Sequence, residues 1–140
     1  MDDIDQRLLA LLGKDARTSA SDLAATLKIS RGTVQNRIGR MQDQGIIKRF
    51  TVELGDGQQD QQISAFTLIR VAADDGKVAI AALKRIEGVM DISTLSGEFD
   101  LVVELRTSSL RELDTLLDKI RAIKDVAQTQ SHIRLMTVAL

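Results

Sequence analysis

Apolar residues recur every three or four positions through the first 45 residues, and this spacing predicts three amphipathic helices. The first is expected over residues 4–12. The second opens at Ser19, which forms a capping box with Asp22. The third runs from a Ser30 cap to Gly45, which ends it. The side chains expected to be buried are Ile4, Leu8, Leu11 and Leu12 in the first helix, Leu23, Ala24 and Leu27 in the second, and Val34, Ile38 and Met41 in the third.

Beyond Gly45 the helical spacing gives way to strict alternation. Over residues 46–54, Phe50, Val52 and Leu54 fall on one side and charged or polar residues on the other, which predicts a strand. The segment that follows reads GDGQQDQQ, contains no apolar side chain, and is expected to be a linker. The predicted division is a first domain at residues 1–54, a linker at 55–62 and a second domain at 63–140.

The second domain alternates between strand and helix patterns. Strands are expected at residues 63–72, 89–95, 101–106 and from about residue 126, and helices at 77–86 and after a capping box formed by Ser109 and Glu112. The order βαββαβ is that of the ferredoxin-like fold. The expected fold class is therefore α+β, with an N-terminal three-helix helix-turn-helix domain joined by a strand and linker to a ferredoxin-like domain.

Both faces of the first strand in this second domain are apolar. Ile63, Ile69 and Val71 fall on one face, and Phe66 and Leu68 on the other. Two helices cover only one face of a four-stranded sheet, and a large apolar face is not left in water. A second copy of the sheet is expected to cover it, which makes the protein a homodimer. The alternative is a monomer in which the N-terminal part covers the face.

The second and third helices fit the helix-turn-helix template. A small residue, Ala24, stands where the two helices approach, Ile29 fills the turn, and Val34 follows ten residues after Ala24. The turn carries Lys28 where glycine is usual. This arrangement leaves the outer face of the third helix free for a major groove, although an unrelated three-helix bundle would show a similar pattern.

The charge distribution supports DNA as the partner. The whole chain has 19 cations and 20 acids, yet residues 28–49 hold six cations and one acid. With three Phe as the only aromatic residues, base stacking is poorly supplied, so double-stranded DNA is favoured over single strands or RNA. Arg, Gln and Asn suit base edges, and a helix N-terminus suits a phosphate. The residues expected to contact DNA are Ser30, Arg31, Thr33, Gln35, Asn36, Arg37, Arg40 and Lys48.

The residues available for catalysis are few. The chain has no Cys, no Trp, no Tyr and a single His, at position 132. No nucleophile, metal site or cofactor site is expected, and the protein is not expected to be an enzyme. The acidic start MDDIDQ is unlike a signal peptide, and no apolar run approaches the ~18 residues of a membrane span. A cytoplasmic, nucleoid-associated protein with no membrane partner is expected.

Several motifs in order resemble the Lrp/AsnC family, the feast/famine transcriptional regulators. They are IDQRLLALLGKDART, SASDLAATLKIS with TVQNRI, MQDQGIIKRF and SGEFD, and together they extend over nearly the whole chain. The resemblance implies an N-terminal helix-turn-helix domain and a C-terminal ligand-sensing domain of ferredoxin-like form. It also implies dimers that assemble into octamers or other multimers, with amino acids as effectors.

The resemblance places the effector beside the SGEFD loop and the start of the last strand. The residues carried over are Gly97, Glu98, Phe99, Asp100, Gln128, Thr129, Gln130 and Ser131. Gly97 would let main-chain amides approach a carboxylate, and Glu98 or Asp100 could pair with an ammonium group. A plain β-hairpin needs no ligand to explain the same glycine. The chain departs from the family in having no Pro and in carrying Glu98, where Asp is also common.

The expected function is that of a sequence-specific DNA-binding regulator, modulated by a small effector of the amino-acid class. A dimer would read a pseudo-palindromic site in double-stranded DNA. Two alternatives stay open. One is an enzyme resembling the siroheme decarboxylases, which share the fold; the other is a stand-alone ligand-binding protein, which would leave the basic third helix unexplained.

Overall fold

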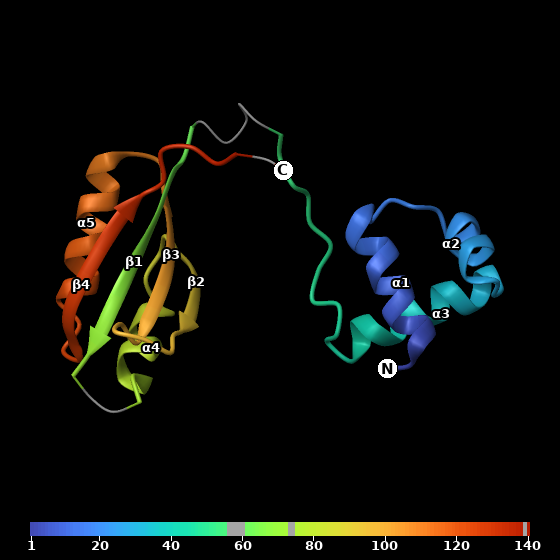
Figure 1. Cartoon of the computed structure of the whole chain (residues 1–140), viewed down its shortest axis with the longest axis horizontal. Helices are drawn as coiled ribbons and strands as arrows, with labels where there is room; N and C mark the ends of the chain where they lie inside the picture. The colour runs from blue at the N-terminus through green and yellow to red at the C-terminus, as the bar shows by residue number, and fades with distance from the viewer. Residues whose placement is uncertain (56–60, 73–74, 139) are drawn as a thin grey trace. The chain divides into compact units, whose positions relative to one another are not determined.

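The computed structural model describes residues 1–55, 61–72, 75–138 and 140. The chain forms two compact units, Met1–Glu53 and Leu54–Leu140, and each is described by itself. Figure 1 shows a helical first unit and a second unit built on a sheet. No helix among the described residues is both long enough and apolar enough to cross a membrane.

The first unit contains the three predicted helices, α1 (Asp3–Lys14), α2 (Ala20–Leu27) and α3 (Arg31–Asp43). Their ends follow from local chemistry, because the side chains of Asp2, Ser19 and Ser30 each accept a hydrogen bond from the backbone three residues ahead. Gly45, at φ +71°, ends α3 in the left-handed conformation. The core is formed by Leu8, Leu12, Leu23, Ala24, Leu27, Val34 and Met41.

The strand predicted over residues 46–54 is wrong. The segment is not assigned to any strand, and the sheet of the second unit consists of four other strands. Alternation selects the residues for one face of a strand, but a strand also needs a neighbour for its backbone groups, and the sheet does not provide one here. Phe50 and Val52 are consequently exposed. Most of the predicted linker, residues 56–60, lies outside the described residues, so the predicted domain boundaries stay a prediction.

The second unit has the predicted ferredoxin-like order. Its elements are β1 (Ile63–Val71), α4 (Lys77–Leu83), β2 (Val89–Thr94), β3 (Leu101–Thr107), α5 (Leu110–Arg121) and β4 (Val126–Ile133). The sheet order is β2-β3-β1-β4, with all neighbours antiparallel. The helix expected at 77–86 ends at Leu83, and Ile86 lies in the turn that follows.

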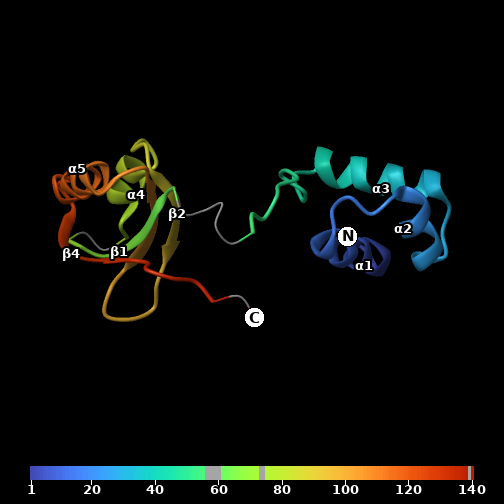
Figure 2. The same cartoon turned by 90° about the horizontal axis from the view of Figure 1, so that it is seen from above.

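Helices α4 and α5 lie on the same side of the sheet, as Figure 2 shows. Ala65 and Ile69 of β1 point toward these helices, as do the buried residues of β3, and together they form the core of the second unit. Gly88, at φ +96°, permits the close approach of α5, because a Cβ there would lie 2.9 Å from Cδ2 of Leu116. The opposite face of the sheet carries no helix of the second unit and is called the open face below. It includes Phe66 and Leu68 of β1.

Candidate nucleic-acid interface and effector site

The turn between α2 and α3 positions the recognition helix. Lys28 adopts the left-handed conformation, with φ 55° and ψ 44°, and its N–H donates to the carbonyl of Ala24. The N–H of Ile29 donates to the same carbonyl at 3.1 Å. The backbone thus makes the turn that usually contains glycine, with lysine at that position.

The outer surface of α3 carries most of the residues predicted to contact DNA. The exposed ones are Ser30, Arg31, Gln35, Asn36, Arg40 and Lys48. Thr33 is partly buried, and its hydroxyl lies 2.7 Å from the Ser30 hydroxyl, which also caps the helix. Val34 and Met41 are fully buried on the opposite side of the helix. Gln, Asn and Arg side chains are therefore available to base edges and phosphates along one surface.

Arg37 and Arg40 are bound to acids at the start of α1. Arg37 Nη1 lies 2.7 Å from Asp2 Oδ2 and 2.9 Å from Asp5 Oδ1, and Arg40 Nη2 lies 2.8 Å from Asp5 Oδ2. Asp5 is 1% exposed. Asp2 and Asp5 also form a reciprocal capping box at the N-terminus of α1. The Arg37 guanidinium hydrogen-bonds both carboxyls and holds the pKa of each below its ordinary value.

The prediction from sequence did not include these ion pairs. Asp5 stands three residues before Leu8 and seven before Leu12, so it falls on the apolar stripe of α1. An acid on a buried stripe indicates a cation on a facing element. Lys28, Arg31, Lys48 and Arg49, by contrast, form no ion pair with any residue that the structure describes.

The SGEFD loop is joined to the end of β1 through Asp100. The Asp100 N–H donates to the Ile69 carbonyl at 2.9 Å, and Asp100 Oδ2 accepts from the Val71 N–H at 2.8 Å. One carboxylate oxygen of Asp100 is thus already engaged with the backbone. A Cβ on Gly97 would meet nothing within 4 Å, so the packing of the described chain does not require glycine there.

Arg70 brings the other predicted effector residues together. Its Nη2 lies 3.0 Å from Glu98 Oε1, and its guanidinium carbon lies 5.4 Å from the centre of the Phe99 ring. In the register of β1 and β4, Arg70 stands opposite Gln128. The loop and the start of β4 therefore lie at the same end of the sheet, with Arg70 between them. The sequence prediction omitted Arg70, although its place on the open face follows from the alternation of β1.

The four predicted residues of β4 point to two different faces. Gln128 and Gln130 pair with Arg70 and Leu68 on the open face. Thr129 and Ser131 pair with Ile69 and Thr67 of the helix-facing side, and the Ser131 hydroxyl donates to the Thr67 hydroxyl at 2.9 Å. A ligand on the open face would therefore meet the two glutamines and not the two hydroxyls.

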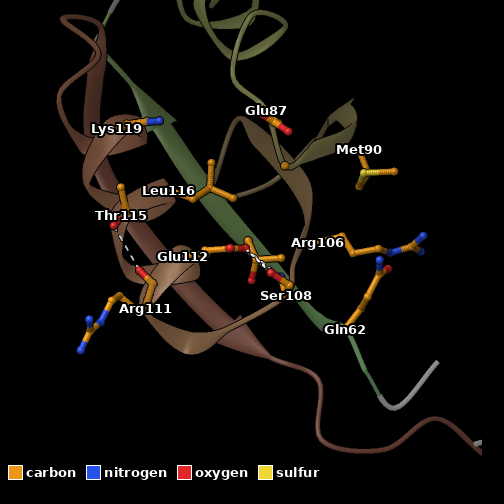
Figure 3. A pocket seen from close by; sticks show the side chains of 12 residues that line it. Gln62, Glu87, Met90, Arg106, Ser108, Arg111, Glu112, Thr115, Leu116 and Lys119 are labelled. Carbon is orange, nitrogen blue, oxygen red and sulfur yellow. Dashed lines mark hydrogen bonds between the residues drawn. The ribbon is translucent and has the colours of Figure 1, made fainter. Parts of the chain in front are cut away.

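A polar groove of about 720 Å³ lies at the other end of the sheet. Figure 3 shows Glu112 of α5 in this groove, hydrogen-bonded to Ser108. The Ser108 hydroxyl and N–H donate to this carboxylate at 2.6 and 3.0 Å and lower the pKa of Glu112. The cations that line the groove, Arg106, Arg111 and Lys119, form no ion pair with any described residue. The groove thus brings three cations together with the carboxylates of Glu87 and Glu112.

His132 lies on the open face of the sheet. Its ring stacks on the Phe66 ring with 5.0 Å between centroids. The guanidinium carbon of Arg134 lies 4.9 Å from the centre of the Phe66 ring. Arg134 also forms two hydrogen bonds with Glu104, of 2.6 and 2.9 Å. In the part of the chain that the structure describes, no group of three or more His, Asp or Glu side chains could hold a metal ion.

Both parts of the chain match known protein families. Residues 1–48 match the family of winged helix-turn-helix DNA-binding domains, and residues 64–139 match the Lrp/AsnC ligand binding domain. The chain is 34% identical to the uncharacterised HTH-type transcriptional regulator PH1916 of Pyrococcus horikoshii over an alignment of 142 positions, which covers 99% of the chain and 95% of the relative. It is 31% identical to the HTH-type transcriptional regulator LysM of Saccharolobus solfataricus over 138 residues, 98% of the chain and 95% of that regulator.

Solved structures show the same architecture. The feast or famine regulatory protein Rv3291c of M. tuberculosis, in complex with L-methionine, superposes with a TM-score of 0.82 at 32% identity. The match covers 99% of this chain and 95% of that chain. The sequence relatives and the solved structure thus match nearly the whole chain.

Proposed function

Since the chain belongs to the Lrp/AsnC family of DNA-binding transcriptional regulators, we propose that it reads double-stranded DNA with the exposed surface of α3 and responds to an amino acid at the SGEFD end of its sheet. The single observation that carries the DNA part is that Arg31, Gln35 and Asn36 are exposed together on one surface of α3, with Lys48, which forms no ion pair with a described residue, nearby in sequence.

Within this proposal the exposed residues have two roles. Arg31, Gln35 and Asn36 contact base edges, and Arg31 is the residue best suited to guanine. Ser30 and the partly buried Thr33, at the start of α3, and Lys48, beyond its end, contact the phosphate backbone. A good bidentate base contact is worth roughly 1–3 kcal/mol of discrimination, so its loss relaxes sequence preference more than it weakens binding in general.

The test is the sequence preference of Arg31→Ala. DNA sites are selected from a random duplex pool with the wild-type protein, and the affinity for a selected site is compared with that for a random-sequence duplex. Arg31→Ala is expected to reduce this ratio about tenfold or more. Arg85→Ala, which removes an exposed arginine after α4, is the charge-matched control and is expected to keep the ratio. An unchanged ratio in Arg31→Ala would show that α3 does not read bases through this residue.

The effector part rests on the opposite charges that meet beside the loop. Arg70 can bind a carboxylate and Glu98 an ammonium group, and the ion pair between them at 3.0 Å can open to accept a zwitterion. Gln128 supplies an amide opposite Arg70 on the same face. The complex of the relative Rv3291c with L-methionine supports the amino-acid class for this chain. Gly97 leaves room for the ligand's main chain, because a Cβ there would have no atom within 4 Å from described residues other than its two neighbours in the chain.

The test is a thermal-shift screen of the twenty amino acids on wild type, followed by two arginine variants. Arg70→Gln is expected to abolish the shift of any hit, and Arg106→Gln is expected to preserve it. Both variants remove one arginine from the sheet, but Arg106 lines the groove at the opposite end. The reverse outcome would place the effector in that groove. Replacement of Asp100 is a poorer test, because its carboxylate holds the Val71 N–H and its loss would destabilise the loop.

We also propose that the protein assembles through the open face of its sheet. Two copies that pair through the open faces of their sheets present two α3 helices to a pseudo-palindromic site, and the two helices enter major grooves about one turn apart. Further association of dimers into octamers or other multimers would place effector sites near neighbouring dimers.

A further inference from the structure

Two of the six cations in residues 28–49 are already neutralised within the first unit. Asp2 and Asp5, called the α1 carboxylate pair below, bind Arg37 and Arg40 in three ion pairs of 2.7–2.9 Å. The four side chains together carry no net charge. The surface that α3 offers to DNA is therefore less basic than the sequence indicates.

We propose that the α1 carboxylate pair withholds Arg37 and Arg40 from DNA phosphates and so sets the ratio of specific to non-specific DNA binding. Non-specific affinity depends on the number of cations that can neutralise phosphates. Base readout by Arg31, Gln35 and Asn36 does not depend on that number. Non-specific binding depends on phosphate contacts alone, whereas a specific complex is also held by base contacts that fix the position of α3 on the duplex. Restraining two arginines therefore lowers non-specific binding more than specific binding, and the ratio of specific to non-specific affinity rises.

The geometry favours this role over simple packing. The Arg40 side chain is 51% exposed, so water or a phosphate could reach it, yet it donates to the buried carboxylate of Asp5. Asp2 offers both of its oxygens to the same Arg37 nitrogen, at 2.8 and 2.7 Å. The N-cap position of this capping box needs a hydrogen-bond acceptor but no charge, and Ser or Asn would serve equally well there. The cap geometry therefore does not require a second negative charge at Asp2, whereas restraint of Arg37 uses it.

The inference rests on the proposed role of α3, and the test separates the two. Asp2 is the residue to change, because its side chain is 54% exposed and both Asn and Ser cap helices well. Asp2→Asn and Asp2→Ser each leave the four-residue cluster with one net positive charge. Asp3→Asn is the matched control: it removes the same charge from the same turn of α1, and Asp3 is exposed and forms no ion pair with any described residue.

The measurement is the affinity of the full-length protein for a random-sequence duplex between about 50 and 200 mM salt. Both Asp2 variants are expected to bind this duplex several-fold more tightly than Asp3→Asn at the low-salt end. Their plot of log affinity against log salt is expected to steepen by up to about 0.9 for each subunit on the DNA. Affinity for a selected site should rise by less, so the specificity ratio falls. A thermal melt of each variant confirms that the first unit is folded.

Equal salt slopes and equal affinities for the Asp2 variants and Asp3→Asn would overturn the inference. They would show that the change in DNA binding comes from the net charge of the protein and not from the release of Arg37 and Arg40. Weaker binding to every duplex by both Asp2 variants would also overturn it, since the pair would then only support the fold. Arg31→Ala keeps the outcomes separate. If Arg31→Ala retains the wild-type sequence preference, the proposed role of α3 is wrong, whatever the Asp2 variants show. If Arg31→Ala loses that preference while the Asp2 variants and Asp3→Asn have equal salt slopes, only the inference about the α1 carboxylate pair is wrong.

Discussion

Asp5 has almost no exposed surface, yet it carries a charge, and this combination constrains the first unit. A buried carboxylate is destabilising unless it is paired and hydrogen-bonded. Asp5 satisfies this condition with Arg37 and Arg40, which come from α3, 32 and 35 residues away in sequence. The start of α1 is therefore tied to the centre of the recognition helix by charge as well as by the core around Leu8 and Met41.

The pH dependence of this contact follows from the direction of the pKa shifts. Hydrogen bonds from Arg37 lower the pKa of Asp2 and Asp5 in the folded protein. A lowered folded-state pKa contributes stability above the unfolded-state value and loses it as pH falls through the folded-state value. The first unit is expected to lose stability as pH falls below about 4.

Amide NMR signals of α1 and α3 report this loss during acid titration, with those of β1 as the internal reference. Asp2→Asn removes one of the two titrating carboxyls, so its stability is expected to fall less steeply over the same pH range. Identical acid profiles for wild type and Asp2→Asn would contradict the assigned role of Asp2.

Among the elements, the turn between α2 and α3 carries the clearest backbone cost. Lys28 is the only residue other than glycine with positive φ among the described residues. The left-handed conformation places Cβ close to the following carbonyl and costs a residue with a side chain roughly 1–2 kcal/mol. The neighbouring contacts, with Ala24 and Leu27 buried beneath the turn, hold the backbone there nevertheless.

Lys28→Gly is expected to raise the free energy of unfolding of the first unit by about 1 kcal/mol, because glycine adopts this conformation without the Cβ clash. Lys28→Ala removes the same charge but keeps the Cβ, and serves as the control. Because the chain has no Trp or Tyr, the helical circular dichroism signal in urea is a suitable measurement. Equal stability of the Gly and Ala variants would contradict the backbone explanation.

The same elements show what sequence predicts well. Helices α1, α2 and α3 were predictable because their apolar spacing, and for α2 and α3 also their serine caps, are encoded within the segment itself. The order βαββαβ was predictable for the same reason. The strand at residues 46–54 was not, because pairing depends on a neighbour that alternation does not reveal. The candidate DNA-binding site shows the same limit. The charge of Arg37 can be seen in the sequence, but its partners Asp2 and Asp5 lie at the start of another helix, so these particular ion pairs could not be predicted.

At the level of the whole molecule, the open face of the sheet would link assembly in the second unit to DNA recognition by the first. Leu68 lies at its centre, between Val102 of β3 and Gln130 of β4, and is only partly covered. Phe66 next to it is flanked by His132 and Arg134. A symmetric dimer would bury this strip against its own copy, and the buried apolar area would stabilise the pairing. DNA recognition would then depend on the sheet, because a palindromic site requires two copies of α3.

Leu68→Lys tests this dependence. A lysine at the centre of the open face can reach water in a monomer, but in a dimer paired through this face its charge would be buried against the partner's sheet. The variant is expected to be monomeric by light scattering at concentrations where wild type is dimeric or larger, and to bind a selected palindromic site at least tenfold more weakly. Val78→Lys is the matched control, since Val78 is an exposed apolar residue on α4, outside the open face, and should preserve both properties. A Leu68→Lys protein that stays dimeric would place the interface elsewhere and would remove the open face as the link between assembly and DNA binding.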